Sequence, residues 1–145
     1  MFDFKNASKE ELEREYKRIA KECGDDTFFT KKELNHLPSA LMEMEQVIAF
    51  SSGLMDNNTW LIVLTDRRIL FLDKGMFFGL KQTAIPINKV NAVSGKTGMI
   101  LGAIEISDGH ATRKIKNVPK ATVLHFVNKV QETIPPFHSE VQHLM

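Results

Sequence analysis

The middle of the chain alternates short apolar runs with turn residues, a pattern that predicts consecutive β-strands. Three runs are rich in β-branched and aromatic residues, at positions 46–52, 59–65 and 68–72. The pattern continues over residues 80–86, 90–95, 98–107 and 110–116, and Asp108-Gly109 is the strongest hairpin signal in the chain. We therefore expect seven antiparallel strands that follow one another as a meander.

The first forty residues instead show helical spacing of apolar positions. Two capping-box pairs mark the predicted helix starts: Ser8 with Glu11, and Thr30 with Glu33. Gly24 supplies a stop for the first helix, and Pro38 limits the second. We interpret four apolar residues here as docking residues, with a partner-binding surface as the alternative: Phe28, Phe29, Leu34 and Leu37. The first helix is expected to pack at the edge of the core or against another subunit.

A third helix follows the strands. Pro119 stands where a first helical turn tolerates proline, and Pro135-Pro136 ends the segment. Five apolar residues mark one face of it: Val123, Phe126, Val127, Val130 and Ile134. Curling the seven strands into a barrel whose mouth this helix plugs would cover both the helix face and the open ends of the sheet. The predicted fold class is mainly β, a barrel plus helices.

One hairpin carries a family resemblance. The segment at residues 60–72, WLIVLTDRRILFL, strongly resembles the second hairpin of bacterial pleckstrin-homology-like domains of the YokE type. Flanking segments agree with that family over about residues 38–134: Glu45-Gln46-Val47, Ile85-Pro86-Ile87-Asn88-Lys89-Val90 and Asn117-Val118-Pro119-Lys120. Met44 departs from the pattern, because a glycine is expected there. The resemblance implies a PH-like barrel at 38–134, which leaves the helical extension at 1–37 and a tail at 135–145 outside it.

The corner of that hairpin has a structural interpretation. Asp66 and Arg67 form the turn, and the Thr65 hydroxyl is placed to hydrogen-bond its backbone. For Arg68 we expect an ion pair with Asp66 or Asp73 rather than a bound anion.

Charge is distributed unevenly although the net charge is only +1. Residues 24–65 hold two Lys against six acids, giving −4, whereas residues 66–120 hold ten Lys or Arg against four acids, giving +6. PH domains that bind phosphoinositides place basic side chains around the loop joining their first two strands. Here the loop at 53–58 has no Lys or Arg. We therefore expect no specific phosphoinositide site.

The apolar hairpin at residues 74–81 is the candidate interaction surface. Its residues are three apolar side chains between two cations: Lys74, Met76, Phe77, Phe78 and Lys81. Ordinary packing, a protein interface and insertion between lipid headgroups all remain open for it.

Catalytic and metal-dependent functions find little support in the sequence. The five histidines have no metal-ligand spacing, and Cys23 has no evident base beside it. Basic residues at 113–116 alternate between strand faces, which disfavours nucleic-acid binding. The chain begins without the basic and apolar stretches of a secretory signal, so we expect a cytoplasmic location.

These observations predict a non-enzymatic module without cofactor or metal. Its expected role is protein–protein interaction or assembly, first of all with itself as a homo-oligomer. The alternative is peripheral contact with an anionic membrane surface.

Overall fold

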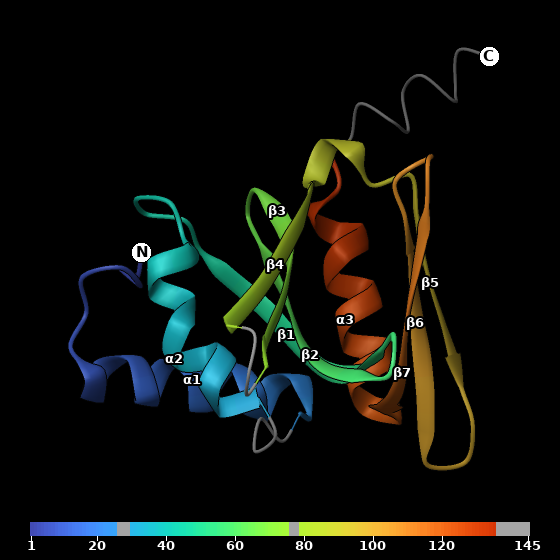
Figure 1. Ribbon diagram of the computed structural model, residues 1–145, viewed down its shortest axis with the longest axis horizontal. Coiled ribbons are helices and arrows are strands. Elements are labelled where there is room, and N and C mark those ends of the chain that lie inside the picture. The colour runs from blue at the N-terminus through green and yellow to red at the C-terminus, as the bar shows by residue number, and fades with distance from the viewer. Residues whose placement is uncertain (26–29, 76–78, 136–145) are drawn as a thin grey trace.

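The computed structural model describes residues 1–25, 30–75 and 79–135, with only the backbone described at positions 74, 75, 79 and 80. It contains the seven expected strands: β1 (Val47–Met55), β2 (Asn58–Thr65), β3 (Arg68–Gly75), β4 (Gly79–Pro86), β5 (Ala92–Thr97), β6 (Leu101–Ser107) and β7 (Thr112–Pro119). The helices are α1 (Lys9–Cys23), α2 (Lys31–Ala40) and α3 (Lys120–Thr133), with a short 3₁₀ turn η2 (Ile87–Lys89) after β4. Figure 1 shows their arrangement.

The strands form one antiparallel sheet in the order β4-β3-β2-β1-β7-β6-β5. The two halves join at β1 and β7 through the single pair Leu54 and Lys116, so the sheet bends sharply there. α3 lies between the halves, as Figure 1 shows, and the interior of the bend is thereby filled. This confirms the predicted PH-like architecture of a seven-stranded barrel closed by a C-terminal helix.

The core is built around α3. Val123, Phe126 and Val130 are fully buried on its inner face. β5 runs so close to the helix that a Cβ added at Gly95 would come within 2.5 Å of a Val123 methyl group. Glycine is therefore required at position 95 for the helix to lie against this strand.

The N-terminal helices cover the opposite face of β1–β3. α1 begins with the predicted capping box, in which Ser8 accepts from the Glu11 amide while the Glu11 side chain accepts from the Ser8 amide. It ends at Gly24, whose φ of 66° is left-handed. Because helices lie on both faces of this part of the sheet, residues 69–72 of β3 are all fully buried. The extension therefore packs on its own barrel.

Three local expectations need correction. Thr30 makes no capping hydrogen bond, and its hydroxyl lies 2.8 Å from the Ser52 hydroxyl instead. α2 also continues two residues beyond Pro38, to Ala40. The loop expected at 53–58 is only the two-residue turn Asp56-Asn57, because β1 and β2 extend into it. Phe28 and Phe29 lie outside the described residues.

Candidate functional site

Thr65 organises the turn of the motif hairpin. Its hydroxyl oxygen accepts from the amides of Arg67 and Arg68, both at 3.0 Å, and the hydroxyl donates to Glu45 at 2.6 Å. The expected role of Thr65 in shaping this turn is therefore seen directly, and its hydroxyl also connects the turn to a buried carboxylate.

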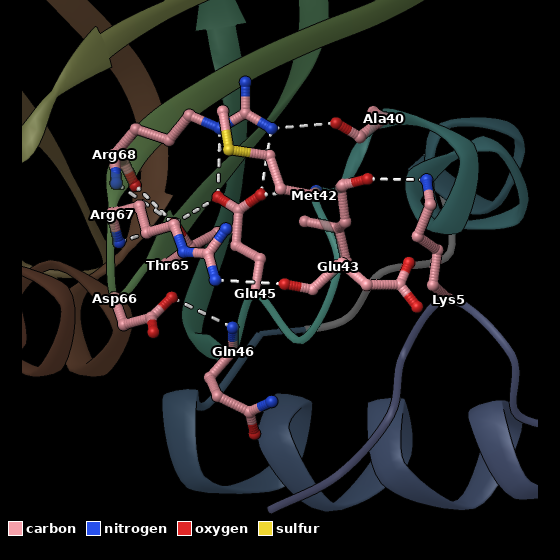
Figure 2. Close-up of polar contacts among 11 residues, drawn as sticks. Lys5, Ala40, Met42, Glu43, Glu45, Gln46, Thr65, Asp66, Arg67 and Arg68 are labelled. Carbon is pink, nitrogen blue, oxygen red and sulfur yellow. Dashed lines mark hydrogen bonds and ion pairs between the residues drawn. The ribbon is translucent and has the colours of Figure 1, made fainter.

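Arg68 makes a bidentate ion pair with the Glu45 carboxylate. Its Nε and Nη2 donate to the two Glu45 oxygens, each at 2.9 Å, and Nη2 also donates to the Ala40 carbonyl at 2.8 Å (Figure 2). The Glu45 side chain has no exposed surface and that of Arg68 is 15% exposed. The expected partners Asp66 and Asp73 were wrong: the partner is Glu45, which lies 23 positions earlier in the sequence, in the connection between α2 and β1.

The neighbours of Arg68 in the turn, Asp66 and Arg67, also bind the connection between α2 and β1. Arg67 Nη2 donates to the Glu43 carbonyl at 3.0 Å, and Asp66 accepts from the Gln46 amide at 3.0 Å. Figure 2 shows these side chains converging on residues 40–46. Because the two guanidinium groups are used in internal contacts, this cluster is a structural clamp rather than an anion site.

The clamp also sets the ionisation of Glu45. Burial alone would raise the pKa of this carboxyl, but hydrogen bonds from Arg68, the Met42 amide and Thr65 oppose it. The net result is a Glu45 pKa below its ordinary value of 4.5. The carboxylate is therefore the stable form in the folded protein at neutral pH.

The turn between β1 and β2 was the expected place to look for a headgroup site. Beside it is a depression of about 470 Å³ whose lining includes three cations from β7: Arg113, Lys114 and Lys116. These cations do not converge on one point. Arg113 lies over the Phe71 ring with Nη1 3.5 Å from Asp108, and Lys114 lies 4.0 Å from Glu105. Sequence reasoning missed the depression because β7 is distant from this turn in the chain.

The turn between β5 and β6 presents an exposed apolar tip, which we define as Met99, Ile100 and Leu101. Their exposed fractions are 96%, 78% and 47%. Gly98 donates to the Leu101 carbonyl at 2.8 Å, which closes the turn beneath these side chains. The sequence interpretation placed 98–107 in one strand and so hid the tip. The available signal was three apolar residues enclosed by Gly98 and Gly102.

The candidate surface at 74–81 is only partly visible. Met76, Phe77 and Phe78 lie outside the described residues, and of Lys74 only the backbone is described. Lys81 is exposed on β4, opposite Asp73 of β3 in the sheet register. An interaction role for this hairpin stays a prediction.

The described part of the chain buries its thiol and gathers no group of metal ligands. Cys23 is 1% exposed, and burial is the main cause that raises the pKa of its thiol to about 11. Within residues 1–25, 30–75 and 79–135, no three His, Cys, Asp or Glu side chains gather as metal ligands. None of the described helices has the length and apolar character needed to cross a membrane.

The chain resembles known proteins in family and in fold. A family model described as bacterial PH domain matches residues 41–132, more than half of the chain. The chain is similar to a DUF1696 family protein with a pleckstrin-homology domain from Shewanella loihica PV-4, with 12% identity, a TM-score of 0.50, and coverage of 71% of this chain and 90% of that one.

A second similar structure is the pleckstrin homology domain from Shewanella amazonensis SB2B. It has 17% identity, a TM-score of 0.44, and coverage of 72% of this chain and 83% of that one. No curated protein matches the chain. At 12% identity, the likeness to the Shewanella loihica structure bears on the fold alone.

Proposed function

Because this chain belongs to the bacterial PH domain family, we propose that it is a non-catalytic binding module that assembles with a second copy of itself through the edge strand β5. The family match agrees with the resemblance found in residues 60–72. A PH-like fold supports a binding role in general, and the partner is a separate question that the surface must answer. We propose a cytoplasmic location, which the unpaired thiol of Cys23 supports.

The observation that supports self-assembly is an open edge of the described sheet, whose two edge strands are β4 and β5. β5 pairs with β6 on one side, and on its other side no described strand follows. Antiparallel pairing uses the backbone groups of alternate residues, so the remaining amides and carbonyls of β5 point away from the sheet. Residues 94–97 are all exposed. This strand therefore offers a ready template for another strand.

The simplest partner for this edge is the β5 strand of a second copy of the chain. Two β5 strands related by a two-fold axis pair antiparallel, and each supplies the groups that the other lacks. The exposed side chains of Ala92 and Ser94 are small and do not obstruct the approach of another backbone. A two-fold pairing centred on Ser94 places the two Ser94 side chains directly opposite each other on one face of the sheet, with their Cβ atoms about 5 Å apart.

The test uses this closeness. We expect Ser94→Glu to prevent assembly, because the two new carboxylates would face each other and also Glu105, which lies opposite Ser94 in the β5–β6 register. Ser94→Gln has nearly the same shape without the charge and serves as the matched control. The readout is sedimentation velocity over a concentration series, with thermal melting to confirm that each variant is folded.

We expect wild type and Ser94→Gln to associate as concentration rises, while Ser94→Glu stays monomeric at low salt and recovers association when salt screens the charges. Wild type that is monomeric at every concentration refutes the proposal. Equal association of Ser94→Glu and Ser94→Gln shows that β5 is not the interface.

A further inference from the structure

The exposed apolar tip is the most conspicuous surface feature that the motif hairpin and the β5 edge leave unexplained. The described residues include six large apolar side chains that are strongly exposed: Met1, Met42, Met99, Ile100, Leu101 and Leu124. Three of these six are consecutive and lie at the end of one hairpin. Figure 1 shows the turn joining β5 and β6 extending beyond the first turn of α3, at the lower right.

The tip is held in position by its surroundings. Thr97 pairs with Gly102 at the end of the ladder, and the Lys120 amide at the start of α3 donates to the Ile100 carbonyl at 3.1 Å. A Cβ at Gly102 would lie 2.1 Å from the Lys96 carbonyl oxygen, so the two strands approach each other very closely beneath the tip. The apolar side chains are therefore presented by an ordered hairpin anchored on a helix.

Two lysines flank the tip. Lys96 precedes it and Lys120 lies beside it, and both side chains are exposed. No Asp or Glu occurs anywhere between Asp73 and Glu105 in the sequence, whereas four lysines do. The start of α3 also contacts the end of α1, where Glu22 is paired with Arg18.

The small area of the tip favours a lipid bilayer over a protein as its binding partner. A stable protein interface covers about 800 Å² on each partner, far more than three side chains at the end of a hairpin provide. A bilayer needs no complementary pocket, because a few apolar side chains enter the headgroup region while nearby lysines stay at the anionic surface. We infer that the tip, with Lys96 and Lys120, docks the protein on the surface of an anionic phospholipid bilayer.

This inference is independent of self-assembly. The tip follows the C-terminal end of β5, so antiparallel pairing of two β5 strands places the two tips at opposite ends of the pair. Each tip stays exposed, and one of them can reach a bilayer surface. A protein that remains monomeric would dock in the same way. The result of the lipid experiment is therefore independent of the sedimentation result.

The experiment is flotation of the full chain with vesicles of phosphatidylcholine alone and with vesicles that also contain phosphatidylglycerol. We expect wild type to float only with the anionic vesicles, and less at high salt. The double variant Met99→Ser with Ile100→Ser should lower the apparent affinity at least tenfold. Met42→Ser is the matched control, because it removes another exposed methionine far from the tip.

A second measurement reports insertion directly. In Met99→Trp, emission from the new indole should shift to shorter wavelength when anionic vesicles are added, relative to the wild-type background from Trp60. Replacing Lys96 and Lys120 by Gln should weaken binding to anionic vesicles while leaving the fold intact. Wild type that fails to float, or a double variant at Met99 and Ile100 that floats as wild type does, overturns the inference.

Discussion

Removing the Arg68 guanidinium tests the clamp that connects the motif hairpin to the N-terminal extension. Arg68→Ala would leave the Glu45 carboxylate buried without its cation and would free the Ala40 carbonyl. Breaking a buried ion pair from one side costs about 3–5 kcal/mol. Because Arg68 is 15% exposed, water can partly replace it, and we expect a loss of about 3 kcal/mol in the free energy of unfolding.

The assay is urea unfolding followed by the fluorescence of Trp60, the single tryptophan, which is 7% exposed in the folded protein. Thermal melting should show a corresponding decrease in Tm of about 10 °C. Arg67→Ala is the control in the same turn. Its exposed guanidinium makes one hydrogen bond to a carbonyl, so its loss should cost less than about 1 kcal/mol.

Combining Glu45→Gln with Arg68→Ala sharpens the test. A neutral amide is less costly to bury than an unpaired carboxylate, so the double variant should be more stable than Arg68→Ala alone. A loss for Arg68→Ala no larger than that for Arg67→Ala would refute the view that the pair is a buried clamp. A double variant less stable than Arg68→Ala alone would also refute the buried clamp.

Two further predictions concern pH and packing. Because the Glu45 pKa is lower in the folded protein than its ordinary value of 4.5, its contribution to stability is present above that value and is lost as pH falls through the lower folded pKa. Urea unfolding of Glu45→Gln between neutral and acid pH should therefore show a shallower loss than wild type. Gly102→Ala would place a Cβ against the Lys96 carbonyl, so β5 must shift, and we expect urea unfolding to show a loss of about 1–3 kcal/mol.

Local sequence patterns predict much of the fold. The strand pattern, the Asp108-Gly109 hairpin signal and the Ser8 capping box each depend on residues a few positions apart. The capping box formed as expected, and the hairpin formed with a four-residue turn at 108–111 where two residues were expected. The expected meander holds within β1–β4 and within β5–β7, but it is wrong between β4 and β5, which lie at opposite edges because the two halves join through β1 and β7. Boundaries were harder, because β1 and β2 continue through residues that also favour turns, up to Asp56-Asn57.

Contacts between distant segments were the parts that the sequence could not provide. Asp66 and Asp73 are the acids nearest Arg68 in sequence, but Glu45 reaches it only because β1 and β3 lie beside the same central strand. Likewise, the narrow apolar stripe of α1 was compatible with its own barrel or another subunit. Residues 69–72 of β3 are fully buried, and α2 contacts this strand, so the chain's own helices cover this face of the sheet.

The central claim is that β5 is an assembly edge, and hydrogen exchange of its amides tests this most directly. Exchange measured for wild type at low and high protein concentration should show protection of residues 92–97 rising with concentration, while β2 in the centre of the sheet does not change. Protection of β5 that is the same at both concentrations, or a concentration-dependent change confined to other strands, would contradict the account.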